Sequence, residues 1–334
     1  MNSLQQYKSI AIIQTAFIGD AVLALYLAQE IKQLNPLCKV HFVCTPISAP
    51  LVHCARAVDT VIPYDKRKAQ SGWKGIKAIA KQLQALQTDC VLGLQRSIRT
   101  TLIAKICGAT TTVGFTNSAL SWLYKHRVEW KTGIHETQRN KQMLTALGCE
   151  LSSTLPRVQS TLPEVELPFT SNKPIVAIAP GSVWATKRWL EEYFVETAIQ
   201  LQNKGYTVVL IGGNDDAARC GTIARLSNSI SLAGEFTLPQ TASLLTQCHA
   251  LLTNDSAPTH IAGLVGCKTI TIFGSTIPEF GFAPCGESDI VLENKELQCR
   301  PCGLHGKKEC PLGTMECMKS ITPEIVLSNF EQLN

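Results

Sequence analysis

Residues 9–20 read SIAIIQTAFIGD, a short apolar run followed by a loop that ends in Gly-Asp. An apolar-periodic stretch comes next and predicts a helix from about Asp20 to Leu34. The second half of the chain repeats this plan with the apolar run Ile175–Ala179, the turn Pro180-Gly181-Ser182 and a predicted helix over about 190–204. Each half therefore opens with a buried strand that leads into a loop and a helix.

Seven further short apolar runs fit the same alternation of strand and helix. In chain order they are Val40–Cys44, Thr60–Pro63, Cys90–Leu94, Thr112–Phe115, Thr207–Ile211, His249–Thr253 and Thr269–Phe273. Alternating strands and helices are typical of α/β domains whose parallel sheets are covered on both faces and bind ligands at the carboxyl ends of the strands. We expect two such domains, residues 1–168 and 169–334, joined by the Pro-containing stretch Leu155–Pro174.

The composition is that of a globular protein. The 334 residues include 31 Lys or Arg and 26 Asp or Glu, a formal net charge of +5, with 45% hydrophobic and 17% charged residues. These values exclude a disordered or fibrous chain, and the length predicts about two domains. The first apolar stretch is interrupted by Gln14 and by Gly19-Asp20, well short of the roughly 20 residues needed to cross a bilayer. We expect neither a signal peptide nor a transmembrane helix.

Charge is divided unevenly between the two halves. Residues 1–168 hold 19 basic and 10 acidic side chains, a net of +9, whereas residues 169–334 hold 12 and 16, a net of −4. The basic excess is densest at Lys66, Arg67, Lys68, Lys74, Lys77 and Lys81, followed by Arg96 and Arg99. Such a cluster is either a solvated helix face or a site for an anionic lipid, membrane or nucleic acid. Nucleic acid is disfavoured because only Trp73 is interleaved with these cations.

Fourteen cysteines are present, and ten of them lie singly in apolar or mixed segments, as is typical of small buried side chains in a reducing compartment. The other four, Cys299, Cys302, Cys310 and Cys317, form one group in a segment rich in Gly, Pro and Lys. Only the first pair has the spacing of a zinc knuckle. A metal site, a disulfide and a metal-free cysteine-lined turn therefore remain three interpretations of this segment.

Asp20 lies at the predicted start of the first helix. A carboxylate at that position commonly caps the helix by accepting hydrogen bonds from backbone N–H groups. The functional alternative is a general base that takes the proton of an attacking hydroxyl. The residue type and its position fit both roles.

Two loops of the second half are candidate sites for a nucleotide. Pro180-Gly181-Ser182 frees backbone N–H groups, and Lys187 adds a positive charge, which together suit phosphate unless the segment is an ordinary strand-to-helix loop. The turn Gly212–Asp216 follows another strand, where a carboxylate either accepts from ribose hydroxyls or caps the turn. The chain contains no Asp-x-Asp triplet, which disfavours a divalent ion held by such a pair.

A third loop follows the strand that ends at Thr253. Asp255 and Ser256 are expected at the start of a helix with Pro258 in its first turn, and the exposed N–H groups of such a helix bind anions. His260 lies four residues after Ser256, near the same face of the helix. A single histidine in this position is more often structural than catalytic.

Together these segments resemble the ADP-heptose:lipopolysaccharide heptosyltransferases of glycosyltransferase family 9, over nearly the whole chain. The individual motifs are not specific, but their order and spacing are. The matching stretches are Phe17-Ile18-Gly19-Asp20, Ala179-Pro180-Gly181-Ser182, Thr186-Lys187-Arg188-Trp189, Leu210-Ile211-Gly212-Gly213 and Thr253–Gly263. The cysteine-rich segment is more similar to the second heptosyltransferase of the pathway than to the first.

The resemblance implies a GT-B fold, in which two Rossmann-like domains face one another across a cleft, the first binding the acceptor and the second the nucleotide-sugar. It implies an inverting transfer of heptose from ADP-heptose to the inner core of lipopolysaccharide, an acceptor of the lipid A–Kdo type. The reaction would take place in the cytoplasm, at the inner face of an anionic membrane that the protein contacts peripherally. No cofactor, metal or nucleic-acid partner is implied.

By position, the resemblance makes Asp20 the general base and places Ser182 and Lys187 at the donor diphosphate. Further donor contacts implied in this way are Asp255, Ser256 and His260, with Asp215 or its neighbours Asn214 and Asp216 at the ribose. Arg96 and Arg99 become candidates for contacts with acceptor phosphates or carboxylates. Two alternatives remain: a GT-B transferase or an epimerase of similar plan that uses another nucleotide-sugar, and a non-catalytic protein that binds sugar nucleotides or lipids.

Overall fold

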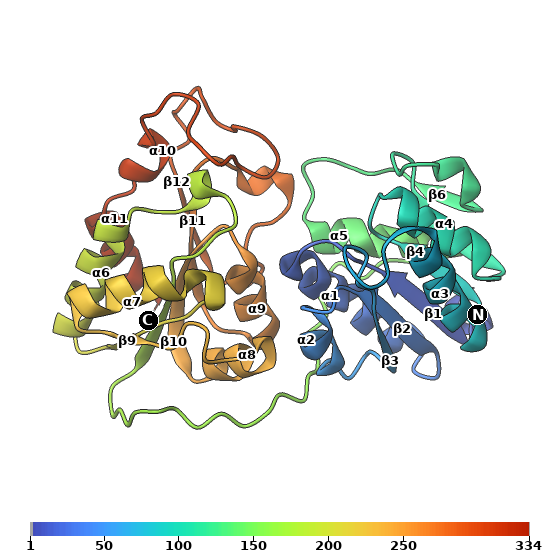
Figure 1. Cartoon of the computed structure of the whole chain (residues 1–334), viewed down its shortest axis with the longest axis horizontal. Helices are drawn as coiled ribbons and strands as arrows, with labels where there is room; N and C mark the ends of the chain where they lie inside the picture. Colours follow the sequence, from blue (N-terminus) through green and yellow to red (C-terminus); the bar gives the residue numbers. More distant parts are fainter. Residues whose placement is uncertain (1–2, 334) are drawn as a thin grey trace. The chain divides into compact units, whose positions relative to one another are not determined.

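The computed structural model describes residues 3–333, and the chain divides into two compact units, Met1–Thr161 and Leu162–Asn334. Each unit contains one parallel, six-stranded sheet with helices packed on it (Figure 1). The division lies within the stretch expected to be a linker, and residues 162–174 form neither helix nor strand.

The first sheet has the strand order β3-β2-β1-β4-β5-β6, which is the order of doubly wound dinucleotide-binding folds. Its strands are β1 (Ser9–Ile13), β2 (Lys39–Cys44), β3 (Thr60–Pro63), β4 (Cys90–Gly93), β5 (Thr111–Phe115) and β6 (His126–Val128). In the central strand β1, Ile10 pairs with Val40 on one side and with Cys90 on the other. All residues of β1 are buried, as expected for a strand covered on both faces.

Five α-helices belong to this unit: α1 (Ile18–Leu34), α2 (Ala49–His53), α3 (Gly72–Ala85), α4 (Ile98–Ile106) and α5 (Glu136–Lys141). α1 and α5 pack together, and a buried ion pair between them joins Lys141 Nζ to Glu30 Oε2 at 3.1 Å. Lys141 also donates to the backbone carbonyls of Ser152 and Thr154, at 3.0 and 3.1 Å. These bonds hold the segment that follows α5 against α1.

The second sheet has the strand order β12-β11-β10-β7-β8-β9, which is the same topology as the first when its strands are counted from β7. Its strands are β7 (Ile175–Ala179), β8 (Thr207–Leu210), β9 (Ile230–Ser231), β10 (Cys248–Asn254), β11 (Thr269–Phe273) and β12 (Ile290–Glu293). Its helices are α6 (Glu191–Asn203), α7 (Ala217–Ser227), α8 (Leu238–Thr246), α9 (Ala257–Val265), α10 (Glu316–Lys319) and α11 (Pro323–Phe330).

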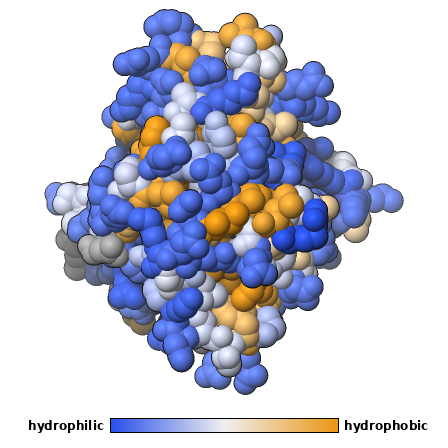
Figure 2. Space-filling model, turned by 90° about the vertical axis from the view of Figure 1, so that its left-hand side faces the viewer, coloured by the Kyte–Doolittle hydropathy of each residue, from blue (hydrophilic) through white to orange (hydrophobic). Residues whose placement is uncertain are grey.

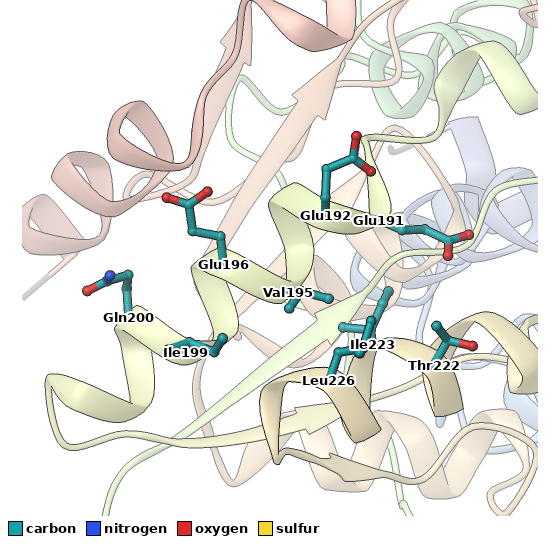
Figure 3. Close-up of a pocket in the computed structure, with 9 residues that line it drawn as sticks. All are labelled: Glu191, Glu192, Val195, Glu196, Ile199, Gln200, Thr222, Ile223 and Leu226. Atoms are coloured by element: carbon teal, nitrogen blue, oxygen red, sulfur yellow. The ribbon is translucent and has the colours of Figure 1, made fainter.

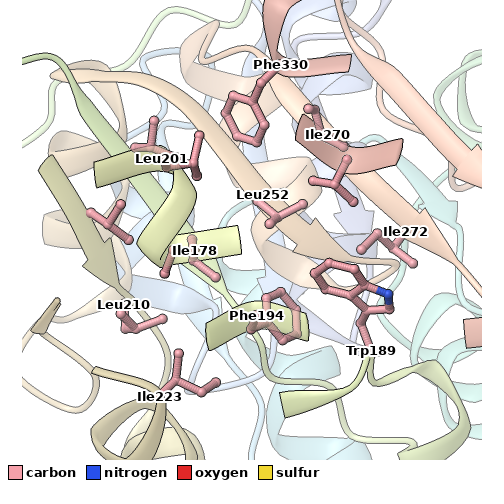
Figure 4. Packing of buried hydrophobic residues seen from close by; sticks show 14 of the residues in the cluster. Ile178, Trp189, Phe194, Leu201, Leu210, Ile223, Leu252, Ile270, Ile272 and Phe330 are labelled. Atoms are coloured by element: carbon pink, nitrogen blue, oxygen red, sulfur yellow. The ribbon is translucent and has the colours of Figure 1, made fainter. Parts of the chain in front are cut away.

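The second unit has its own hydrophobic core. Ile178 of β7, Leu252 of β10 and Ile270 of β11 contribute strand side chains, and Phe194 and Phe330 contribute rings from helices (Figure 4). The first unit buries a separate cluster around β1, β4 and α3. Because each core is made of residues from one unit, each unit has the packing that an independently folding domain needs.

The nine strands expected from the sequence are confirmed to within one residue at either end. The sheets contain three more strands, β6, β9 and β12, which the sequence pattern did not indicate. All three lie at sheet edges, and none is fully buried. β6 and β9 lack a continuous apolar run, and β12 has only three apolar residues before Glu293. Among residues 3–333, no helix combines the length and the apolarity that a membrane span needs.

Candidate functional site

The candidate residues lie at the carboxyl ends of parallel strands in both units. In the first unit Asp20 follows β1, and Arg96 and Arg99 follow β4. The candidate residues of the second unit come after three strands, β7, β8 and β10. In chain order they are Ser182, Lys187, Asp215, Asp255, Ser256 and His260. Because the strands of each sheet run in the same direction, the loops after them meet at one edge. Each unit therefore presents one candidate site at that edge.

Asp20 is the third residue of α1, and its side chain is half-buried. The N-cap of this helix is Phe17, because the helical backbone begins at Ile18. The interpretation of Asp20 as the helix cap is therefore wrong. A carboxylate in the first turn nevertheless interacts favourably with the positive end of the helix dipole.

A lysine from another strand end shares the surroundings of Asp20. Lys66, which follows β3, is half-buried and donates from Nζ to the backbone carbonyl of Thr15, in the loop before α1. Burial lowers the pKa of Lys66, the charges of Arg67 and the exposed Arg99 lower it further, and the charge of Asp20 raises it. Asp20 and Arg99 therefore lie close enough to Lys66 for their charges to act on it.

A second carboxylate, Glu136 at the start of α5, also interacts electrostatically with Asp20. Glu136 is 6% exposed and forms an ion pair with the fully buried Arg139. Burial raises the pKa of Glu136 to about 7; Arg139 opposes this rise and Asp20 adds to it. Sequence reasoning missed Glu136, because nothing in the local pattern around it indicates proximity to the end of β1.

Trp130 contacts two arginines in the same region. The guanidinium carbon of Arg96 lies 4.4 Å from the centre of the Trp130 ring, and that of Arg139 lies 4.2 Å from it. Arg139 also donates to the backbone carbonyls of Lys131 and Ile134, at 2.9 Å each. The exposed Arg96 is therefore held beside a ring that the buried Arg139 keeps in place, with its charge open to a ligand.

In the second unit Lys187 and Asp255 form an ion pair at the carboxyl end of β10. Lys187 Nζ lies 2.6 Å from Asp255 Oδ2, and the two side chains are 13% and 8% exposed. Thr276, in the loop after β11, donates from Oγ1 to the same carboxylate oxygen at 2.6 Å. Lys187 is therefore a positioned cation and differs from the exposed lysine of an ordinary strand-to-helix loop.

The loop that carries Lys187 is tied to the strand end by Asn254. Asn254 Oδ1 accepts from the backbone N–H of Trp189 at 3.0 Å, and its Nδ2 donates to the carbonyl of Pro180 at 3.0 Å. Ser182 is half-buried, and its carbonyl accepts from Arg188 Nε at 2.7 Å. These bonds fix both ends of the loop from Pro180 to Trp189.

Helix α9 begins beside the Lys187–Asp255 pair. As expected, Ser256 is its N-cap and Pro258 lies in its first turn. The backbone N–H groups of this turn and Lys187 thus combine at one strand end in an arrangement that suits an anion. His260 is buried in the same helix, with its ring edge-on to that of Phe282 at 6.3 Å between centroids.

The turn after β8 presents its two carboxylates differently. Asp215 is exposed. Asp216 is half-buried and lies over two glycines: a Cβ on Gly181 would lie 2.2 Å from Asp216 Oδ1, and one on Gly212 would lie 2.7 Å from Asp216 Cβ. Only glycine permits this approach, which brings Asp216 against the loops after β7 and β8.

The cysteine-rich segment packs on the Lys187 loop. A Cβ on Gly306 would lie 3.1 Å from Lys187 Cγ, and the backbone N–H of Lys307 donates to Thr186 Oγ1 at 2.8 Å. At the start of the segment, Arg300 donates to backbone carbonyls at and just after the end of β11. The segment therefore forms part of the wall around Lys187.

The four cysteines of this segment are free thiols, and within residues 3–333 no three His, Cys, Asp or Glu side chains are placed to hold a metal ion. Burial raises the pKa of Cys302, and that of Cys317 to about 11. Backbone N–H groups of Met315 and the residues just before it lower the pKa of Cys310. The segment thus contains thiols whose pKa values are shifted in opposite directions.

A groove lies between α6 and α7 (Figure 3). Its floor is apolar, with Val195, Ile223 and Leu226, and glutamates 191, 192 and 196 belong to its lining. Carboxylates repel a diphosphate, so the groove does not suit a nucleotide. Figure 2 shows several patches of hydrophobic residues among hydrophilic ones on one face of the molecule.

Comparison with known proteins gives this geometry a context. Residues 76–314 match the family model described as glycosyltransferase family 9 (heptosyltransferase). The chain is 24% identical over 333 residues to the lipopolysaccharide core heptosyltransferase OpsX of Haemophilus influenzae, covering 95% of this chain and 93% of that protein. It is 28% identical over 171 residues to lipooligosaccharide heptosyltransferase 2 of Campylobacter jejuni, where it spans 52% of that protein's length.

The fold also matches solved structures. The structure of Escherichia coli ADP-heptose LPS heptosyltransferase II superposes with a TM-score of 0.76, at 21% identity, over 97% of this chain and 98% of the other. This likeness, together with the two parallel six-stranded sheets, confirms the expected GT-B class of fold, with two Rossmann-like units.

Proposed function

Because the chain belongs to glycosyltransferase family 9 and is a glycosyltransferase, we propose that it transfers heptose from ADP-heptose to the inner core of lipopolysaccharide. The observation that carries this proposal is the Lys187–Asp255 pair beside the start of α9 in the second unit. There the ammonium of Lys187 and the N–H groups of the helix start form a candidate site for an anion. The names of the relatives agree with it: OpsX is a lipopolysaccharide core heptosyltransferase, and the E. coli structure is an ADP-heptose transferase.

The second unit is proposed to bind the donor. Lys187, Ser182 and the N–H groups at Ser256 hold the diphosphate, because a fixed ammonium and oriented N–H groups are the strongest ligands for it here. Asp255 and His260 lie toward the sugar. Asp215 or Asp216 faces the ribose, and the close approach of Asp216 to Gly181 and Gly212 supports the latter.

The first unit is proposed to bind the acceptor and to supply the base. Asp20 takes the proton of the acceptor hydroxyl as its oxygen attacks the anomeric carbon from the face opposite ADP, so that the new C–O bond forms with inversion and ADP leaves. Lys187 and the α9 N-terminus stabilise the charge that grows on the diphosphate. Arg96 and Arg99 bind phosphates or carboxylates of a lipid A–Kdo acceptor at the cytoplasmic face of an anionic inner membrane.

We propose that this transfer needs no metal or cofactor, since Lys187 and the helix start already supply positive charge where a divalent ion would otherwise act. Turnover in a chelator such as EDTA is therefore expected to stay within about twofold of turnover with added Mg²⁺. The measurement is ADP release in both buffers. A loss that Mg²⁺ or Mn²⁺ restores would refute the metal-free mechanism.

The function is tested by ADP release from ADP-heptose, with and without a heptose-deficient lipopolysaccharide acceptor. Release is expected to depend on the acceptor, and Asp20→Asn is expected to lower it by about 100-fold or more, since a general base contributes roughly 10²–10⁴. Asp89→Asn, at the opposite end of the first sheet, is the control. Donor binding without release would point to another acceptor, and absence of donor binding would refute the ADP-heptose assignment.

A further inference from the structure

The outward face of α3 carries a tryptophan among lysines. Trp73 and three lysines of this helix are exposed, and the exposed Arg67 and Lys68 precede it in the loop after β3. We name the set Arg67, Lys68, Trp73, Lys74, Lys77 and Lys81 the α3 surface. The opposite side of the helix is anchored, because Ile76, Ile79 and Leu83 are buried in the core of the first unit. The α3 surface is therefore a fixed face.

The charge of this face is of one sign. The chain has no acidic residue between Asp65 and Asp89, a stretch that includes the whole helix. Trp73 remains 48% exposed, and Lys77 Nζ lies 5.7 Å from the centre of its ring. Lys66 does not belong to this face, since its ammonium turns inward to the carbonyl of Thr15. The α3 surface is thus separate from the surroundings of Asp20.

We propose that the α3 surface docks the enzyme on an anionic lipid bilayer, with Trp73 in the headgroup region and the lysines against lipid phosphates. Tryptophan is the side chain that favours the bilayer interface, since its ring is apolar and its N–H is polar. Each Lys or Arg near an anionic membrane strengthens binding about fivefold, so that four to five of them give firm attachment at moderate salt. The inference rests on the proposed function, because a glycolipid acceptor places the reaction at a bilayer.

A bilayer fits this face better than nucleic acid does. Proteins that bind single strands stack successive bases on several aromatic side chains, and the α3 surface has one. Three of its cations lie along about two turns of one helix, from Lys74 to Lys81, and the described residues offer no helix-turn-helix partner to place them in a groove. A broad cationic face with one interfacial tryptophan is the pattern of a peripheral membrane contact.

Binding is tested by co-sedimentation of the full chain with phosphatidylcholine vesicles, with and without phosphatidylglycerol. Binding is expected only with the anionic lipid and is expected to weaken with salt. The double variant K74E/K81E is expected to bind at least about 30-fold more weakly. The matched control K105E/K173E changes two exposed lysines outside the α3 surface. Its affinity for the anionic vesicles is expected to fall much less. Equal loss in both variants, or binding of K74E/K81E like the unaltered chain, overturns the proposal.

Insertion is tested by quenching of tryptophan fluorescence with brominated acyl chains. Trp73→Phe is expected to remove most of the quenching, whereas Trp122→Phe, at a residue that is 68% exposed in the same unit, leaves it unchanged. Turnover with a deacylated, water-soluble acceptor is expected to be unaltered in W73F and K74E/K81E. Loss of vesicle binding can therefore be distinguished from loss of the proposed transfer activity. Loss of binding to nucleic acid in K74E/K81E with vesicle binding intact would also overturn the proposal.

Discussion

Lys187 illustrates how one residue is prepared for a charged ligand. Its ammonium is held by Asp255, which is held in turn by Thr276. Lys187→Ala is expected to weaken ADP binding about 10- to 100-fold, because a hydrogen bond to a charged group contributes roughly 1.5–3 kcal/mol. Isothermal titration calorimetry measures this change. Lys308→Ala, an exposed lysine of the neighbouring segment, is the control, and equal ADP affinity of Lys187→Ala and the unaltered chain would contradict the donor assignment.

Cys310 and Cys302 allow a test of thiol acidity at two partly buried positions of one segment. Backbone N–H groups lower the pKa of Cys310, whereas burial raises that of Cys302. The thiolate fraction at pH 7 is larger where the pKa is lower, so Cys310 is expected to react faster with iodoacetamide, and the difference is expected to shrink as the pH rises. Peptide mass spectrometry measures the two rates, and faster labelling of Cys302 would contradict the prediction.

At the scale of elements, two paired strands are shaped to receive a side chain. Gly93 of β4 and Gly114 of β5 are register partners, and a Cβ on either would lie 2.3 Å from the ring or hydroxyl of the buried Tyr124. Gly114→Ala is expected to lower the free energy of unfolding of the first unit by about 1–3 kcal/mol, through overpacking. Urea titration followed by amide exchange in β4 and β5 measures the loss.

The same substitution in a helix provides the control for this prediction. Gly221 lies in α7, and a Cβ added there would meet nothing within 4 Å. Gly221→Ala is therefore expected to stabilise the second unit by about 0.5–1 kcal/mol, because alanine loses less conformational entropy in a helix. If Gly114→Ala also stabilised its unit, the close packing of Tyr124 against Gly114 would be refuted.

Elements differ in how far the sequence foretells them. β1 and β7 are five-residue strands whose side chains are almost all apolar and buried, and their ends were predicted without error because burial on both faces gives a nearly continuous apolar run. The two-residue strand β9 consists of one apolar and one polar residue, Ile230 and Ser231. Its pairing with β8 exists only in the assembled sheet. The edge strand β3 contains the apolar pair Val61 and Ile62 and was predicted, whereas β9 depends on its neighbour β8, which the local pattern does not contain.

The candidate sites show the same division. Ser256 and Pro258 predicted the start of α9, because serine at the N-cap and proline in the first turn are local sequence preferences of helix termini. Glu136 and Trp130 are far from Asp20 and Arg96 in the chain, and their proximity arises from tertiary packing of α5 and the segment before it. Local chemistry therefore indicated which loops are candidate anion sites, while the partners that position a charge emerged only with the fold.

At the scale of the whole molecule, the two units divide the proposed work. All donor candidates belong to the second unit, whose core contains only its own residues. A fragment of residues 162–334 is therefore expected to fold alone and to bind ADP within about threefold of the full chain, since a domain with its own core retains its local site. The fragment of residues 1–161 is expected to fold but not to bind ADP.

Far-UV circular dichroism establishes whether each fragment folds, and calorimetry measures ADP binding. Neither fragment is expected to release ADP from ADP-heptose with acceptor present, because the base and the donor site then lie on different molecules at low concentration. Lys187→Ala in the fragment of residues 162–334 is the matched control, and its loss of affinity should equal that in the full chain. A folded 162–334 fragment without ADP affinity would show that the nucleotide site needs residues of the first unit and would overturn this division of labour.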